Sequence, residues 1–314
     1  MSTKVTPIFI MGAPRSGTTF LASSIASHPS IVALPEMHYI FELMEQELLF
    51  GELGLDQKTS ILINSFHFCS LRLFDDVEGL KKFIGNKNVK AIILGLVSLF
   101  NEKHDKKDYQ YWVEHTPHSH RFIEVLKIYF PDAIFVHCIR DPRSVVASTF
   151  KEPWGYKDVI TGAEDWNNKV MGVLKKEKLY DIKTIRYEDF TEDIEINLKR
   201  LCKKIGVDYH YDMLSNTGVV MPEFFEKQQR FSGEKVDKGR KEKWKKDLCD
   251  RDILHIQAVN HKLMQKYGYL SGEDVFVEIT GLKRTIIKVV GRIKYLYLNK
   301  IFKRDARKTL CQLK

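Results

Sequence analysis

The sequence of 314 residues lacks the features of several protein classes. It has only five cysteines, an odd number with no CxxC pair, so neither a disulfide framework nor a zinc site is indicated. Long apolar runs are absent as well, because a charge interrupts every stretch that approaches the length of a membrane span. The opening MSTKVTPIFIMG has no extended apolar region and no cleavage site of a signal peptide. We therefore expect a cytoplasmic protein.

Net positive charge is lacking outside one segment. The chain carries 50 Lys and Arg against 41 Asp and Glu, for a net charge of +9, but residues 281–314 alone hold 11 of the basic residues and a single acid. The remainder is close to neutral, so a nucleic acid partner is not expected. A hydrophobic content of 44% with 29% charged residues is typical of a globular protein with a substantial core.

Short apolar runs alternate with segments of helical period, which is typical of an α/β fold. We expect a P-loop-like, twisted parallel sheet of about five strands flanked by helices, with a helical C-terminal extension. Strands are predicted at 7–11, 111–113, 133–139 and 182–187, and helices at 18–27, 35–50, 57–103, 121–129 and 191–205. Residues 219–246 are predicted to form a long ordered loop. The division predicted is a domain at 1–272 and a basic amphipathic extension at 273–314.

The strongest motif lies between the first strand and the following helix. Residues 12–19 read GAPRSGTT, and two glycines at this spacing let backbone N–H groups surround an anion at a helix N-terminus. The spacing matches a nucleoside-triphosphate loop, but Thr18 stands where that loop has its lysine. Because this lysine bridges the β- and γ-phosphates, the loop is expected to bind a shorter anion without a metal. Arg15 offers a replacement charge.

A second motif follows the strand at 133–139. Arg140 comes directly after its carboxyl end, where open α/β sheets bind their ligands. Asp141 and Pro142 are typical of a helix start, and Ser148 lies about two turns along that helix, so Arg140 and Ser148 can face one crevice. On its own, an Arg-Asp-Pro sequence is also typical of a solvated helix start. Beside the first motif, it indicates a second phosphate site.

The segments PRSGTT and IRDPRSVVAS resemble the two cofactor-binding signatures of sulfotransferases, in the branch that includes tyrosylprotein sulfotransferases and bacterial relatives. Supporting likenesses are EHTP at 114–117, IRYED at 185–189 and GRKEKWK at 239–245, so the resemblance covers roughly residues 5–250. It implies the co-substrate 3′-phosphoadenosine 5′-phosphosulfate (PAPS) and no metal. The acceptor would be a hydroxyl or amine of a small molecule or a glycan, a glycolipid included, and its identity cannot be read from the sequence.

The resemblance also assigns roles to single residues. The 5′-phosphosulfate would be held by the loop residues Arg15, Ser16, Gly17, Thr18 and Thr19, and the 3′-phosphate by Arg140 and Ser148. Tyr187 would contact the adenine, and Trp244 would pack on the nucleotide with Arg240 and Lys245 near the 3′-phosphate. For each of these aromatic residues, ordinary core packing is the alternative.

Two residues are candidates for the chemistry beside Arg15. Glu36 stands where tyrosylprotein-type enzymes carry their catalytic glutamate and would take the acceptor's proton; the alternative is a solvated glutamate at a helix start. His115 stands where the family usually has lysine. It would stabilise the leaving group when protonated, act as a second acid or base, or be a packed residue. His118 and His120 have no metal partner at useful spacing and are interpreted as surface or acceptor-cleft residues.

The basic tail favours a helix with an apolar face. This face contains Leu282, Ile286, Val290, Ile293, Tyr297 and Ile301. One interpretation is a membrane-surface helix attracted to anionic lipid, which would make the protein peripheral to the inner face of a membrane. The other is a helix packed on the body with its basic face solvated.

Two further functions stay open. A small-molecule or nucleoside kinase with a degenerate phosphate loop would consume ATP with Mg²⁺, and Thr18 in the lysine position argues against it. A non-catalytic membrane-associated protein, with a vestigial pocket, would bind liposomes but no nucleotide.

Overall fold

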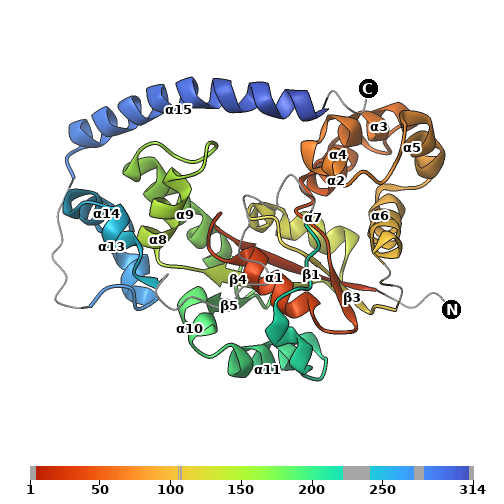
Figure 1. The fold of residues 1–314 in the computed structure, drawn as a ribbon, viewed down its shortest axis with the longest axis horizontal. Coiled ribbons are helices and arrows are strands. Elements are labelled where there is room, and N and C mark those ends of the chain that lie inside the picture. The colour runs from red at the N-terminus through yellow and green to blue at the C-terminus, as the bar shows by residue number, and fades with distance from the viewer. Residues whose placement is uncertain (1–4, 105, 107, 222–240, 272–278, 311–314) are drawn as a thin grey trace.

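A computed structural model describes residues 5–104, 106, 108–221, 241–271 and 279–310, with side chains described up to residue 297. Within these residues, five parallel strands form one sheet in the order β2-β3-β1-β4-β5, with helices on both sides (Figure 1). The strands are β1 (Thr6–Gly12), β2 (Ile31–Ala33), β3 (Tyr111–Glu114), β4 (Ile134–Ile139) and β5 (Lys183–Arg186). The expected fold class is thereby confirmed.

The two faces of the sheet are covered because successive side chains of a strand point to opposite sides. On one face, Phe9 and Met11 pack with α2 (His38–Phe50), α6 (Val89–Lys103) and α7 (Ile123–Tyr129). On the other face, Ile8 and Ile10 pack with α1 (Thr18–Ala26) and α11 (Ile194–Ile205). A buried apolar strand between two helical layers is what the continuous run at 7–11 predicts.

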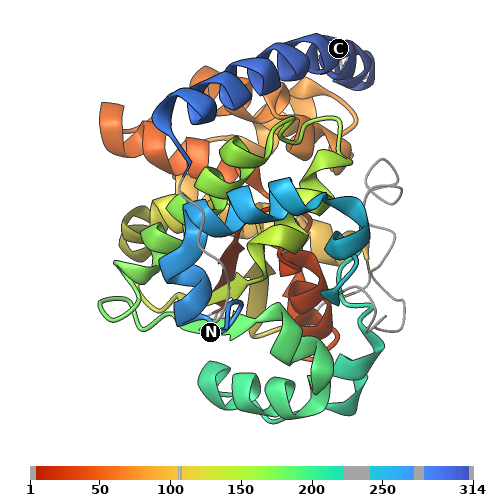
Figure 2. The ribbon, with the colours of Figure 1, turned by 90° about the vertical axis from the view of Figure 1, so that its left-hand side faces the viewer.

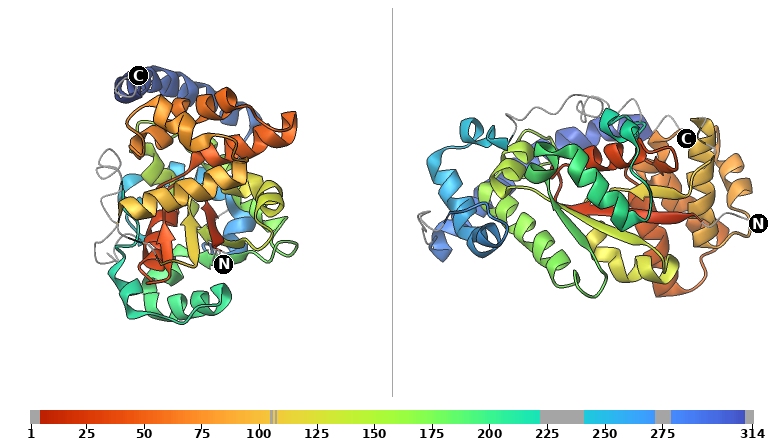
Figure 3. Two further views of the ribbon diagram at one scale, coloured as in Figure 1. Left: turned by 90° about the vertical axis from the view of Figure 1, so that its right-hand side faces the viewer. Right: turned by 90° about the horizontal axis from the view of Figure 1, so that it is seen from below.

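The remaining helices form two groups around the sheet. Between β2 and β3, α2 is followed by α3 (Leu55–Asn64), α4 (Phe66–Ser70), α5 (Val77–Ile84) and α6, which gather on one side of the molecule (Figures 1 and 3). After β4 come α8 (Pro142–Phe150) and α9 (Val159–Leu174), which pack with α14 (Asp250–Lys266). Smaller elements are η1 (Ser119–Phe122), α10 (Tyr187–Glu192), η2 (Tyr211–Ser215) and α13 (Trp244–Asp247).

The C-terminal helix α15 (Gly281–Leu310) runs along the outside of the molecule and contacts α9 and α4 (Figures 1 and 2). The helical C-terminal extension is confirmed, whereas a domain boundary at residue 272 stays a prediction. None of the described helices is long and apolar enough to cross a membrane.

Several predicted boundaries need correction. Strand β2 was not predicted, because three residues between the His28-Pro29 turn and Pro35 give too short an apolar run. The helix expected at 191–205 is split in two, since Asp193 ends α10 and caps α11 by accepting a hydrogen bond from the Ile196 N–H. Of the loop expected at 219–246, residues 222–240 lie outside the described part, and α13 forms within the rest.

Candidate active site

The candidate residues lie along one edge of the sheet. Because all five strands are parallel, their carboxyl ends meet at this edge, where open α/β sheets bind ligands. In sheet order, Glu36 follows β2, His115 follows β3, Arg15 follows β1, Arg140 follows β4 and Tyr187 follows β5. Residues from five separate chain segments are thus gathered into one row.

The loop after β1 is held by two glycines. A Cβ atom on Gly12 would lie 2.4 Å from the Cys138 carbonyl oxygen of the neighbouring strand. Gly17 has a φ of 93°, and a Cβ there would lie 2.4 Å from Cδ2 of Tyr187. Only glycine can both adopt this positive φ and leave room for the Tyr187 ring at residue 17. The Cys138 thiol donates to the Ser16 carbonyl at 3.1 Å, which fixes the loop against β4.

Ser16 is the clearest sign that this loop binds something. Its Oγ atom is buried and has no hydrogen-bond partner among the described residues. A buried hydroxyl without a partner carries a desolvation cost, and an anion seated in the loop would remove it. Thr18 and Thr19 form the first turn of α1, whose N-terminus begins at this loop.

The two sequence motifs meet here. Nε of Arg15 donates to Oγ of Ser148 at 3.1 Å, and Nη1 of Arg140 donates to the Arg15 carbonyl at 3.1 Å. Nη2 of Arg15 also lies 3.4 Å from Oε1 of Glu152. The structure therefore brings together Arg15, Arg140 and Ser148. Their roles toward a ligand stay predictions.

Tyr187 connects the loop and the second motif. Its ring contacts Gly17, and the Arg140 guanidinium carbon lies 4.4 Å from the ring centroid, within cation–π range. Nε1 of Trp166 donates to the Arg140 carbonyl at 2.9 Å. Tyr187 thus supports both halves of the site through its packing, while adenine contact stays a prediction.

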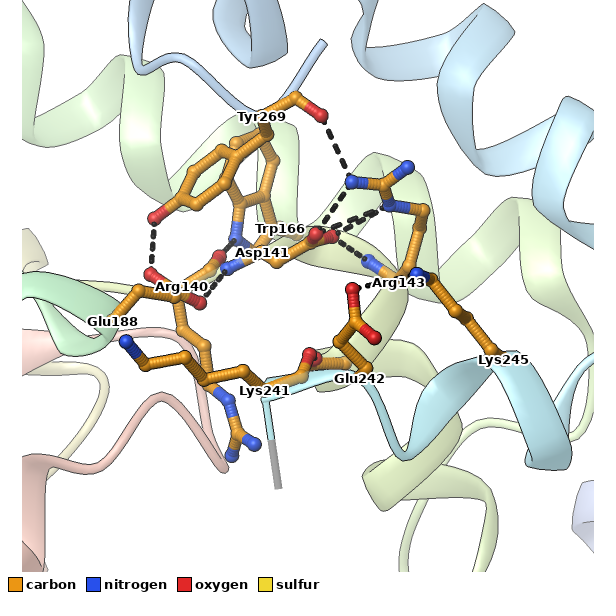
Figure 4. Close-up of polar contacts among 10 residues, drawn as sticks. Arg140, Asp141, Arg143, Trp166, Glu188, Lys241, Glu242, Lys245 and Tyr269 are labelled. Atoms are coloured by element: carbon orange, nitrogen blue, oxygen red, sulfur yellow. Dashed lines mark hydrogen bonds and ion pairs between the residues drawn. The ribbon is translucent and has the colours of Figure 1, made fainter. Parts of the chain in front are cut away.

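A hydrogen-bond network holds the start of α8 behind Arg140 (Figure 4). The Glu188 carboxylate accepts from the Asp141 N–H and from the Tyr269 hydroxyl, both at 3.0 Å. Asp141 caps α8 and pairs with Arg143 through Nη2 to Oδ2 at 2.7 Å, while Nη2 also donates to the Tyr269 carbonyl at 2.8 Å. Burial raises the pKa of Glu188 above its ordinary value. The network joins β4, β5 and the C-terminal part of the domain.

The three residues predicted from the 239–245 segment have different outcomes. Trp244 is buried between α8 and α9, and the Arg143 guanidinium carbon lies 4.2 Å from its ring centroid. Nζ of Lys245 pairs with Oε1 of Glu242 at 2.6 Å (Figure 4). Arg240 lies outside the described residues. Nucleotide contact by these residues stays a prediction, and Arg143, which sequence reasoning missed, is the cation that Trp244 touches.

On the other side of the loop, Glu36 lies in a cluster of histidines. Its Oε2 atom is 3.0 Å from Nε2 of His38 and 4.0 Å from Nε2 of His67, and the two imidazole ring centroids are 4.0 Å apart. The His118 ring lies 6.5 Å from that of His38. The ligand atoms of Glu36, His38 and His67 all fall within 4.8 Å of one another, which is also a spacing that a metal ion could use.

Burial and the neighbouring histidines together determine the charge of Glu36. Burial alone would raise its pKa, but the hydrogen bond from His38, with smaller effects of the neighbouring histidines, brings the pKa below the ordinary 4.5. Burial lowers the pKa of His67 and of His118 to about 4. At neutral pH Glu36 is therefore a carboxylate, which is the form that accepts a proton, and the imidazoles of His67 and His118 are neutral.

His115 and its neighbour Glu114 are fully buried. Burial lowers the pKa of His115, so the ring is neutral at pH 7, and neither ring nitrogen makes a hydrogen bond of good geometry with a described residue. The interpretation that requires a protonated His115 is disfavoured. Glu114 accepts hydrogen bonds from the N–H groups of Met37 at 3.3 Å and Thr116 at 2.8 Å, and so joins β3 to the segment that carries Glu36.

Sequence reasoning missed His38, His67 and Glu114. A signal existed for His38, which is two residues from Glu36, and none for His67, which α4 brings in from another segment. His120 belongs to η1 and is buried, and burial lowers its pKa to about 4. Of the two expected positions, surface or acceptor cleft, the surface position is wrong for His120, and the acceptor-cleft position stays a prediction. His118 is partly exposed beside His38.

A strand, a loop with two close-packed glycines that leads into a helix, and an arginine after the adjacent strand are typical of a P-loop-like α/β protein. The model of the sulfotransferase family matches residues 7–211, more than half of the chain, and the chain belongs to that family. It is a sulfotransferase-family enzyme, as the sequence motifs predict. No curated protein sequence matches the chain.

Solved structures share the fold. The sulfotransferase domain of the Synechococcus PCC 7002 olefin synthase matches with a TM-score of 0.59 and 19% identity, over 86% of this chain and 97% of that one. The sulfotransferase domain from the curacin biosynthetic pathway matches with a TM-score of 0.52 and 18% identity, over 83% of this chain and 98% of that one. A more remote match is retinol dehydratase, solved with androsterone and the inactive cofactor PAP, at a TM-score of 0.37 and 12% identity over 89% of this chain and 84% of that one.

Proposed function

We propose that this sulfotransferase uses PAPS as donor and passes its sulfuryl group to a hydroxyl or amine, with Glu36 as the base. The observation that carries the proposal is the contact between the two motifs, in which Arg140 reaches the Arg15 carbonyl and Arg15 reaches Ser148. Two guanidinium groups within one small site suit a ligand with two separate anionic groups.

The residues of the loop fit the donor's phosphosulfate end. Ser16 supplies a buried hydroxyl without a partner among the described residues, and Gly12 and Gly17 leave no Cβ between the loop backbone and its neighbours. The N-terminus of α1 adds backbone N–H groups and a favourable dipole for an anion. The 3′-phosphate would then lie toward Arg140 and Ser148, on the side of β4.

The transfer would be a single in-line displacement. A bond forms between the acceptor oxygen or nitrogen and sulfur while the bond from sulfur to the 5′-phosphate oxygen breaks, and the electron pair leaves with 3′-phosphoadenosine 5′-phosphate (PAP). The acceptor's proton passes to the Glu36 carboxylate. Arg15 stabilises the charge that develops on the leaving phosphate, and His115, in its neutral form, offers a ring N–H on the β3 side.

Binding of PAP tests the donor assignment. In calorimetric titration without added metal, we expect binding by the wild type and a loss of about 10- to 100-fold in affinity for both Arg15→Ala and Arg140→Ala, as for a lost charge-assisted hydrogen bond. Arg200→Ala, an exposed arginine on α11, is the matched control and should bind as the wild type does. A chelator should change nothing. Preference for ATP with Mg²⁺ over PAP would contradict the proposal.

Turnover tests the base. With PAPS and a panel of simple phenols and sugars, we expect Glu36→Gln to lower kcat by about 10²- to 10⁴-fold, because it keeps the shape but cannot take a proton. Its affinity for PAP should equal that of the wild type. A Glu36→Gln variant with normal kcat would show that another group takes the proton.

A further inference from the structure

On α15 the apolar face is exposed, whereas an ordinary surface helix turns its apolar face toward the core. Seven large apolar side chains between residues 282 and 297 are exposed, from 47% for Val290 to 75% for Leu282. They are Leu282, Ile286, Val289, Val290, Ile293, Leu296 and Tyr297. At about 100° per residue they form one stripe that covers about a third of the helix circumference. A helix that stabilises a core turns such a stripe inward.

The opposite face of α15 is the one that touches the body. Arg284 and Lys288 both pair with Glu164 of α9, through Nη2 to Oε1 at 2.6 Å and Nζ to Oε2 at 2.7 Å. Gly291 is buried, and a Cβ atom there would lie 2.2 Å from Oδ2 of Asp158, the residue that caps α9. The polar edge of α15 is therefore fixed to the body, and its apolar stripe is held outward.

The charge beside the apolar stripe indicates which kind of partner the stripe would bind. Lys283 and Lys294 flank it on one side and Arg292 on the other, and residues 281–304 contain no acid. A second copy of the chain would place the same basic segment against itself, and like charges at close range repel. An anionic lipid bilayer offers both an apolar layer for the stripe and negative charge for its flanks.

We propose that α15 docks the protein on an anionic membrane surface, lying in the plane of the interface with its apolar stripe among the acyl chains. Its 30 residues extend over about 45 Å, and the described helices include no membrane span, so the contact is peripheral. The helix also contacts α4, which carries His67. The surface that meets lipid thus adjoins the Glu36 side of the site.

The test is flotation of the purified full chain with vesicles of phosphatidylcholine alone or mixed with phosphatidylserine. We expect binding only to the mixed vesicles and weaker binding at high salt. Combined substitution of Ile286→Ser, Val290→Ser and Ile293→Ser should reduce binding by about tenfold or more. Leu179→Ser, at another exposed apolar side chain (77% exposed), is the matched control and should bind as the wild type does.

Two outcomes would overturn the proposal. One is failure of the wild type to bind the mixed vesicles, and the other is unchanged binding by the triple variant. Because the three side chains are exposed, the variant should unfold at the wild-type temperature, and this is checked by circular dichroism. Gel filtration adds a third reading: a dimer that the triple substitution disperses, without vesicle binding, would assign the stripe to a second copy.

Discussion

The hydrogen bond from His38 to Glu36 joins the proposed base to a group that favours its ionised form. Since burial opposes the charge on Glu36 and His38 favours it, removing the imidazole should raise the pKa of the carboxyl group. We expect His38→Ala to move the acid limb of the kcat/KM profile to higher pH, because more of the base is then protonated at a given pH. His38→Gln, which keeps a donor, should restore part of the shift.

The profile separates this role from a structural one. A variant that is only less well folded would lose activity at all pH values without moving the limb. An unchanged acid limb in His38→Ala would mean that His38 does not set the charge of Glu36. PAP affinity, measured on the same samples, should be the same in all three proteins.

Glu114 predicts a pH dependence of stability. Burial outweighs three hydrogen bonds and raises the pKa of its carboxyl group from 4.5 to about 7 in the folded protein. The fold therefore favours the neutral form, and the stability that this form contributes at low pH is lost as pH rises from 4.5 through 7, by about 3 kcal/mol. We expect Glu114→Gln to unfold at higher urea concentration than the wild type at pH 8, with little difference at pH 5. Equal midpoints at pH 8 would be evidence against a neutral Glu114.

At the scale of elements, the turn from β1 to α1 depends on the absence of a side chain at Gly17. Gly17→Ala would place a methyl group 2.4 Å from the Tyr187 ring at a φ of 93°, so we expect a loss of about 1–3 kcal/mol in stability and loss of PAP binding. Tyr187→Ala in the same chain removes the clash but not the strained φ, and should recover stability only in part. Full recovery would show that the clash alone matters. Ala22→Gly, in the buried middle of α1, controls for a change of similar size in the same helix.

The elements that sequence could predict are those with local signals. The β1 loop is marked by two glycines, Gly12 and Gly17, after an apolar run, and Arg140 by its place after another apolar run, so both were expected where they lie. Strand β2 carries only three residues, and its pairing with β3 comes from packing that no short window contains. His67 reaches Glu36 because α4 packs near α2, a contact between distant segments.

For the C-terminal helix, the sequence could not predict which face packs against the body. Its helical period predicts the helix. The same period does not decide whether the apolar face or the basic face of the helix packs against the body. The choice is made by Glu164 and Asp158 of the α9 segment, which attract Arg284 and Lys288 and accept the close approach of Gly291. The alternative in which α15 packs on the body with its basic face solvated is therefore wrong in its orientation.

At the scale of the whole molecule, the order of the strands would separate the proposed donor side of the site from the proposed acceptor side. The proposed donor groups follow β1, β4 and β5, and the histidine cluster with Glu36 follows β2 and β3. Because β1 is the central strand, its loop lies where the two sides meet, and the sulfuryl group would be presented at that point. The long insertion α2 to α6 lies between β2 and β3 in the chain and would therefore shape the proposed acceptor side.

This arrangement predicts that the body folds and binds its donor without α15. The helix is attached through ion pairs of Glu164 with exposed partners and through Ile287, which is only partly buried, and exposed ion pairs contribute about 0–1 kcal/mol each. Removal of residues 281–314 should therefore lower the unfolding temperature by only a few degrees, roughly 2–4 °C per kcal/mol in a chain of this size. PAP affinity should be unchanged and vesicle binding lost. If instead the shortened chain fails to fold, or loses PAP binding while folded, the extension is part of the catalytic domain and the predicted division near residue 272 is wrong.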